Sequence, residues 1–274
     1  MLSVNTNTGA MAALQFLNQT QSDLQTTQSH INSGLKVASA TDNGAVYAIA
    51  QNMRGNVAGY QAVSDSLNRG VSTVDVAISA GQSISDLLNE LKGKALAASD
   101  SSLDTASRNA LNADFTALRD QITTIVQNAS FNGVNLVDGS TANYQALASS
   151  DGTKKITAAG QTLKLSGTIV TIKSTSTIST QSKASTMVST INSSIQNVNA
   201  ALAKLASGVK KFQIQSDFVN NLVNTLNAGI GNLVDADMAT ESAKLQSLQV
   251  KQQLGVQALA IANSAPSITL SLFR

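Results

Sequence analysis

Apolar residues recur every three or four positions along most of the chain, and this spacing predicts helices that pack along one face. The first run extends from Ala10 to Leu35 and places Gln21 and Gln28 among the repeating positions. Glutamine in such a seam weakens a helix pair and helps to fix its register, so this segment is typical of a coiled coil that becomes ordered when it is paired. A bend is predicted at residues 32–34, which read Asn-Ser-Gly.

The same spacing resumes after the stretch SATDNGA and predicts one helix from about Asp42 to about Ala98. At 1.5 Å per residue, such a helix is about 85 Å long. Asp104 is a suitable N-cap for a further helix, which the pattern ends near Asn128. Helical spacing then returns over residues 187–233.

Between these helical runs, residues 131–180 show a different period. Asn-Gly at 132–133 and Asp-Gly at 138–139 are typical of tight turns between strands. Residues alternate between apolar and polar within 163–171, which is the period of a half-buried strand. A small β module is therefore predicted in the middle of the chain.

Residues 245–261 form a predicted helix that is apolar on two sides, whereas a helix on a globular core normally shows one apolar stripe backed by charge. One side carries Leu245, Leu248, Val256 and Leu259, and the other carries Val250, Leu254 and Ile261. Two stripes require two partners. We expect one partner to be the N-terminal helix of the same chain and the other to be a neighbouring molecule.

The order of these elements is nearly palindromic, with a charge-poor helix at each end, long heptad helices inside them and a β insert in the middle. We therefore expect a mainly α fold. It would be an elongated antiparallel coiled-coil hairpin of long helices, with paired N- and C-terminal helices and a small central β insert. In this arrangement residues near 20 lie beside residues near 255, and the β insert lies at the far tip.

Composition narrows the function classes. Charged residues make up 12% of the chain and aromatic residues 3%, which favours long helices in close contact. The formal net charge is only +2 and the lysine pairs lack nearby aromatic residues, so nucleic acid is not expected as a partner. No apolar run predicts a membrane span, and there is no cysteine for disulfide chemistry. The first 20 residues contain no basic residue, so we expect any export to use a route other than a secretory signal.

No set of nucleophile, base and orienting partner suggests a catalytic, cofactor or metal site. His30 is the single histidine, so zinc motifs that need two histidines cannot occur, and we expect His30 to be an ordinary helix residue. Asp235, Asp237 and Glu241 could bind a cation. Carboxylates at the start of a helix more often cap it and complement its dipole, and we expect that role here.

Several motifs, in order along the chain, resemble bacterial flagellin. INSGLKVASATDNGAVYAIAQNM resembles the stretch in which one helix ends at Ser-Gly-Leu and the next begins after an Asp-containing turn, and FNGVNLVDG resembles the turn that enters the outer domains. NLVDADMATESAKLQSLQVKQQLGVQALAIAN and the final LSLFR are similar to the most recognisable segment of that family. The short insert and the stretch KALAASDSSLDTASRNAL resemble its alphaproteobacterial branch.

The resemblance implies a non-enzymatic structural subunit that is secreted and polymerises into the extracellular bacterial flagellar filament for swimming motility. It implies an inner core coiled-coil domain of residues 1–37 and 234–274, a long-helix shell of residues 38–138 and 182–233, and a small outer β insert of residues 139–181. Assembly contacts would come from Leu14, Leu17, Leu24, Ile31, Leu245, Leu248, Val250, Leu254, Val256, Leu259 and Ile261.

The resemblance also implies partners other than further copies of the chain. The chain would pass unfolded through the flagellar export apparatus, and an export chaperone would shield the C-terminal segment beforehand. Cap and hook-junction proteins would be further partners. No cofactor, membrane or nucleic acid is implied.

One region departs from common members of the family. In enterobacterial-type flagellins the stretch aligned with LLNELKGKALAAS carries an arginine, a glutamate and a leucine that engage the Toll-like receptor for flagellin. Glu90, Gly93 and Lys94 stand at those places in this chain. A reversed charge and a lost apolar anchor predict a weaker contact with the receptor.

Pro266 is a second departure, because it lies inside the C-terminal segment. Proline removes one helical hydrogen bond and crowds the preceding turn. The sequence therefore predicts that the helix kinks or stops just before Pro266, leaving SITLSLFR as a separately packed tail.

Two other function classes remain as alternatives. A flagellar hook-filament junction protein, or a related axial export protein, should differ in the C-terminal packing segment, which looks fully equipped to polymerise here. An enzyme on a helical scaffold needs a constellation of side chains that the sequence lacks. The Ser/Thr-rich residues 140–181 leave O-glycosylation, as the resemblance suggests for some relatives, and a bare solvated surface both open.

Overall fold

The computed structural model describes residues 6–271, with side chains described as far as Ser264. Contacts divide the chain into two compact units, one made of residues 1–55 and 225–274 and the other of residues 56–224. The first unit combines the first and last helices of the chain, as the sequence predicts. The three-part division expected above has other boundaries than these two units and stays a prediction.

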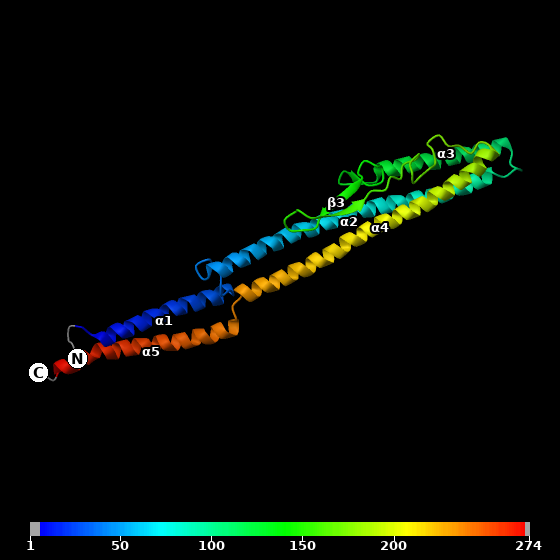
Figure 1. The fold of residues 1–274 in the computed structure, drawn as a ribbon. Coiled ribbons are helices and arrows are strands. Elements are labelled where there is room, and N and C mark those ends of the chain that lie inside the picture. The colour runs from blue at the N-terminus through cyan, green and yellow to red at the C-terminus, as the bar shows by residue number, and fades with distance from the viewer. Residues whose placement is uncertain (1–5, 272–274) are drawn as a thin grey trace. The chain divides into compact units, whose positions relative to one another are not determined.

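In the first unit, α1 (Thr8–Ser33) and α5 (Met238–Ser271) lie side by side (Figure 1). α1 begins at its N-cap Asn7, whose side chain accepts a hydrogen bond from the Ala10 N–H. It ends at Gly34, which has a φ of 71°. Glycine adopts this left-handed conformation without steric cost, so α1 ends where the bend is predicted.

The segment that leaves α1 is hydrogen-bonded to the segment that enters α5. Leu35 and Asp235 form an antiparallel bridge, and the Ala236 N–H donates to the Gly34 carbonyl at 2.9 Å. These bonds satisfy backbone groups that both helix ends would otherwise leave exposed. They hold the end of α1 next to the start of α5.

α5 continues through Pro266 to Ser271, so the predicted stop before Pro266 and the separately packed tail are wrong for the described residues. The final three residues, 272–274, lie outside the described part of the chain. Proline leaves the carbonyl four residues earlier without its helical donor. That carbonyl belongs to Ala262, and it accepts a hydrogen bond from the side chain of Asn7 in the first unit instead.

The second unit has one apolar core, to which α3 (Thr105–Asn128) and most of α2 (Gly44–Ala98) and α4 (Gln181–Val234) contribute. The bounds of α2 and α3 agree with the sequence prediction, and Asp104 caps α3 by accepting a hydrogen bond from the Ser107 N–H at 2.7 Å. The largest fully buried side chains are Phe115, Phe212, Leu67, Ile84, Leu88, Leu91, Ile122, Leu136, Leu163, Ile172, Ile178 and Ile191.

Within this unit α2 and α4 run antiparallel and approach each other closely at glycines. A Cβ added at Gly70 would lie 3.1 Å from the ring of Phe212, and one added at Gly81 would lie 2.7 Å from a methyl carbon of Leu202. A larger residue at either place would push the helices apart. The predicted mainly α hairpin of long helices is therefore confirmed.

The β insert consists of two hairpins. β1 (Ser130–Phe131) pairs with β2 (Val134–Asn135) around the predicted Asn-Gly turn, where both turn residues have positive φ. β3 (Asn143–Leu147) pairs with β4 (Lys155–Ala159) in antiparallel register. The predicted small β insert is thus present.

The β3–β4 hairpin lies along the middle of α2 and α4, not at the far tip as the sequence analysis expected (Figure 1). The Leu147 N–H donates to the Ser66 hydroxyl of α2 at 3.1 Å, and the Gln215 side chain of α4 donates to the Ala148 carbonyl at 3.1 Å. Tyr144 also packs edge-on against a ring of α4, with centroids 6.2 Å apart. An isolated hairpin is marginally stable in water, so it gains most by burying one face on the helices.

Residues 160–180 form no strand in this fully described stretch, and the strand prediction for 163–171 is wrong. Their alternation instead reflects burial: Leu163, Val170 and Ile172 enter the core, Leu165 and Ile169 pack partly buried against it, and the polar residues between them are exposed. The backbone bonds to helix side chains, for example from the Thr171 N–H to the Ser194 hydroxyl at 3.1 Å. Alternation alone does not distinguish a paired strand from an extended segment lying on helices.

Gly59→Ala should destabilise the second unit by about 1 to 3 kcal/mol. A Cβ at Gly59 would lie 2.7 Å from the carbonyl oxygen of Ser150, which is backbone and must move. The matched control is Gly93→Ala in the same helix, where a Cβ meets nothing within 4 Å. The control should be neutral or stabilising by up to about 1 kcal/mol. Urea unfolding of the two variants measures the difference, and equal effects would contradict the proposed close approach.

Candidate interaction surface

One side of each terminal helix is buried in the α1–α5 pair. Leu24 of α1 and Leu248 of α5 are buried, while Leu17 is partly buried and lies against Gly255. The predicted seam is partly wrong, because Leu14, Gln21 and Gln28 are exposed. The polar residue buried in the pair is Thr27 instead. Leu17, Leu24 and Ile31 belong to both versions of the seam.

Polar contacts join α1 and α5 at three levels. The Asn7 side-chain amide donates to the Ala262 carbonyl at 2.6 Å, and the Gln252 amide donates to Gln21 at 2.7 Å. Farther along α1, His30 lies 3.1 Å from a carboxylate of α5. Residue numbers rise along α1 as they fall along α5, so the helices are antiparallel. The predicted proximity of residues near 20 and 255 is confirmed.

His30 and Glu241 form the most enclosed of these contacts. The His30 Nδ1 atom lies 3.1 Å from Glu241 Oε1, and the two side chains are 15% and 14% exposed. Among the described residues, the second Glu241 oxygen and the Thr27 hydroxyl are buried without a hydrogen-bond partner. His30 is therefore more than an ordinary helix residue, because it holds the start of α5 against the end of α1.

The acidic residues near the start of α5 serve as helix-end and pairing groups. Asp237 accepts hydrogen bonds from the N–H groups of Ala239 and Thr240 and from the Thr240 hydroxyl, which confirms the predicted cap. Glu241 is engaged with His30. Among the side chains that the structure describes, no group of three or more His, Asp or Glu is arranged to hold a metal ion.

The opposite side of α5 exposes large apolar residues. Val250, Leu254 and Ile261 are 55%, 58% and 70% exposed, as expected for the outward stripe. Leu245 and Leu259, assigned to the inward stripe, are partly buried. Val256, also assigned to the inward stripe, is 54% exposed and belongs with the outward residues. The two-sided pattern of α5 is therefore present, except that Val256 belongs to the exposed side and not to the side that faces α1.

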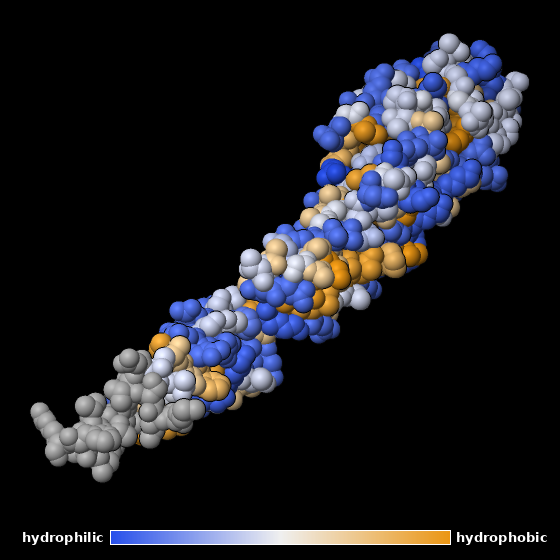
Figure 2. All heavy atoms as spheres, turned by 60° about the vertical axis from the view of Figure 1, so that its left-hand side comes forward, coloured by the Kyte–Doolittle hydropathy of each residue, from blue (hydrophilic) through white to orange (hydrophobic). Residues whose placement is uncertain are grey.

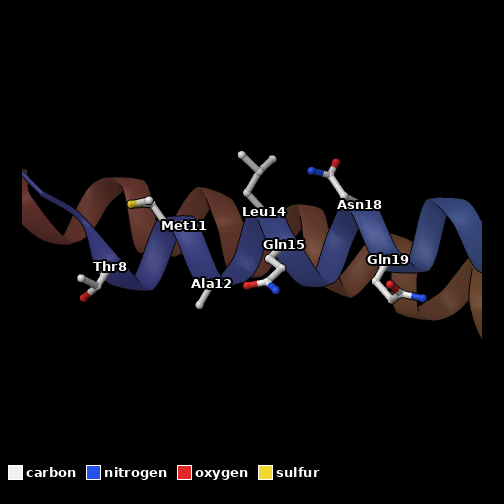
Figure 3. A pocket seen from close by; sticks show the side chains of 7 residues that line it. All are labelled: Thr8, Met11, Ala12, Leu14, Gln15, Asn18 and Gln19. Atoms are coloured by element: carbon white, nitrogen blue, oxygen red, sulfur yellow. The ribbon is translucent and has the colours of Figure 1, made fainter.

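α1 exposes a similar apolar surface. Met11, Leu14 and Phe16 are exposed, and Figure 2 shows apolar atoms at the surface among polar ones. A shallow open hollow runs over this helix and includes Gln15 and Asn18 in its lining. In Figure 3, Met11, Leu14 and Asn18 point to one side of α1, and α5 lies behind the helix. We call the residues Met11, Leu14, Phe16, Val250, Leu254, Val256 and Ile261 the outer apolar surface.

The three residues singled out for receptor contact lie on α2. Glu90 and Gly93 are exposed, while Lys94 is partly buried. The Lys94 ammonium forms an ion pair of 2.5 Å with Asp114 of α3. An ammonium held in this way does not offer an apolar anchor to a partner.

Among the described helices, none is both long and apolar enough to cross a membrane.

Comparisons with known proteins match both ends of the chain to the same family. Residues 4–142 match the family model for the bacterial flagellin N-terminal helical region, and residues 188–273 match that for the C-terminal helical region. Flagellin FljK of Caulobacter vibrioides is 54% identical over 272 residues, covering 99% of this chain and 98% of that protein. A flagellin of Brucella melitensis is 33% identical over 283 residues, covering 100% of both. The crystal structure of Bacillus cereus flagellin aligns with 55% of this chain and 86% of its own, with 18% identity and a TM-score of 0.49.

Asp237→Asn should make the start of α5 less sensitive to acid. The Thr240 hydroxyl and nearby N–H groups hold the pKa of Asp237 below its usual value of 3.8. The ionised carboxylate therefore adds stability above that value, and this stability is lost as the pH falls through the lower pKa of the folded state. Asparagine keeps the cap acceptor and does not titrate. Hydrogen exchange of residues 238–245 below pH 3.8 measures the effect, and an unchanged pH dependence in the variant would contradict it.

Proposed function

This chain belongs to the bacterial flagellin family and is a subunit of the extracellular flagellar filament, and we propose that the outer apolar surface joins it to neighbouring subunits. The family is structural and not enzymatic, and its members polymerise. The Caulobacter and Brucella relatives place the chain among alphaproteobacterial flagellins. The observation that carries the proposal is that large apolar residues of α1 and α5 are exposed outside the seam between these two helices.

Removing these side chains from water favours assembly. Leu254 and Ile261 of α5 and Phe16 of α1 are each more than half exposed in the single chain. Covering the exposed part of one such side chain contributes roughly 1 kcal/mol at about 25 cal/mol per Å². Several of them on two helices together favour a stable contact, provided that the neighbour offers a complementary surface.

The neighbouring copy supplies such a surface if the contacts are head-to-tail. The outer residues of α1, such as Phe16, would then meet the outer residues of α5, such as Leu254, in the next subunit. A heterologous contact of this kind does not close on itself and generates a helical polymer. The inward residues Leu17, Leu24 and Leu248 would act indirectly, by holding the two helices together.

The three-part division expected from the sequence belongs to the same proposal. Residues 1–37 and 234–274 would form the inner core of the filament, residues 38–138 and 182–233 the surrounding shell, and residues 139–181 an outer insert. The outer apolar surface supports the first assignment, because the inner part of a polymer is where apolar side chains are best removed from water.

Export partners form a further part of the proposal. The chain would pass unfolded through the flagellar export apparatus, an export chaperone would shield the C-terminal segment, and cap and hook-junction proteins would meet it at the filament ends. A segment with two apolar sides supports this, because it is prone to aggregate until both are covered. A hook-filament junction role is disfavoured, since full-length relatives carry the name flagellin.

Weak activation of the Toll-like receptor for flagellin is a separate proposal. Exposed Glu90 reverses a charge, Gly93 provides no side chain and Lys94 is held by Asp114. These features support a contact that lacks its central anchors.

The assembly proposal is tested with Leu254→Asp. Wild-type chain should elongate filament seeds, and the variant should raise the critical concentration at least about tenfold, because a charge would be buried in the contact. The matched control is Gln253→Asp, which adds the same charge at an adjacent exposed position. Sedimentation and negative-stain microscopy measure both. Normal elongation by Leu254→Asp, or equal loss in both variants, would contradict the proposed surface.

The receptor proposal is tested in a reporter assay that compares the wild type with the triple substitution Glu90→Arg, Gly93→Glu and Lys94→Leu. The substitution restores the three residue types of the enterobacterial pattern and should increase potency by about tenfold or more. An unchanged potency, or a wild type as potent as an enterobacterial flagellin, would sink the proposal.

A further inference from the structure

Ala262 in α5 has a carbonyl that the helix itself does not satisfy in the usual way. The N–H that normally donates to it belongs to the residue four positions later, and that residue is Pro266, which has no N–H. The helix nevertheless continues to Ser271. An unsatisfied carbonyl at a partly buried site weakens a helix, so a replacement donor matters here.

Asn7 supplies this donor from the other end of the chain. Its Nδ2 lies 2.6 Å from the Ala262 carbonyl oxygen across 255 residues of sequence. The same side chain uses its Oδ1 to accept from the Ala10 N–H at 3.0 Å, and its backbone carbonyl accepts from the Met11 N–H at 3.1 Å. Asn7 therefore caps the N-terminus of α1 and also donates to the carbonyl of α5 that lacks its helical donor.

The amide geometry explains why asparagine suits this position. Serine, threonine and aspartate also cap helices through a side-chain oxygen. Only an amide of this length carries a donor and an acceptor on the same rigid group, so Asn7 can cap α1 with one atom and reach α5 with the other. Gln21 and Gln252 join the helices elsewhere, but there the contact does not replace a missing helical bond.

We propose that Asn7 is a positioning residue that makes the helix across Pro266 depend on the docking of α1. The end of α5 is then well formed only when α1 lies beside it in the observed register. This coupling lies within one chain and goes beyond the assembly proposal, because it does not depend on which residues contact neighbouring subunits.

The test is a double-mutant cycle in the full-length chain with Asn7→Ser and Pro266→Ala. Serine keeps the cap of α1 but is too short to reach Ala262. With Pro266 present, Asn7→Ser should raise the critical concentration of seeded assembly roughly five- to twentyfold and speed amide exchange of residues 262–271. In the P266A background, the helix has its own N–H for Ala262, so the same change should alter either quantity less than about twofold.

Further variants separate coupling from simple damage to the helix pair. Asn7→Asp keeps the size and the cap but removes the donor, and it should behave like Asn7→Ser. Gln21→Ala removes a cross-helix bond far from the proline, so its effect should be the same with and without P266A. Equal effects of Asn7→Ser in both backgrounds would overturn the proposal. Amide exchange of the unassembled full-length chain gives the same comparison if a variant fails to elongate, which keeps this inference separate from the assembly proposal.

Discussion

A pair of helices can bury only one side of each helix, and this constraint governs the first unit. Leu24 and Leu248 are buried between α1 and α5, while Phe16 and Ile261 on the outer sides are 74% and 70% exposed. In the second unit the insert lies on the helices, and Ala146 and Ala158 of its β3–β4 hairpin are buried in a shared core. The described part of the first unit has no such insert, and the apolar side chains left exposed on its two helices are the ones that the assembly proposal assigns to neighbouring subunits.

A narrow seam also gives little information about register. Small and medium side chains repeat along both helices, so a shift by one heptad would exchange similar contacts. Directional bonds remove this ambiguity, since His30 meets Glu241 at one end of the pair and Asn7 meets Ala262 at the other. A shift in register would separate His30 from Glu241. This is costly, because a carboxylate that is shielded from water and has lost its hydrogen bond is poorly tolerated. We infer that the polar residues of the seam select the register that the apolar residues stabilise.

The helices were predictable from sequence because their period is local, whereas the exact seam was not. Leu17, Leu24 and Ile31 fit a 3-4 repeat that continues through Gln21 and equally one that continues through Thr27. The partner helix decides between them, and it buries Thr27. The same reasoning applies to Val256, which lies near the border between the two sides of α5 and is exposed in the pair. The insert was recognised from its turns, but its place on α2 and α4 depends on contacts such as Leu147 to Ser66 that no local pattern contains.

Pro266 shows why a sound local rule gave the wrong helix end. The rule assumes that the carbonyl four residues earlier has no other donor, which holds for an isolated helix. In this chain the donor is Asn7, near the opposite end of the sequence and beside Ala262 once α1 and α5 are paired. A proline that ends a helix in the unpaired segment is thus tolerated in the paired one. Helix formation beyond Ala262 then becomes a consequence of the pairing of α1 with α5, because the donor that replaces the missing N–H of Pro266 comes from the other helix.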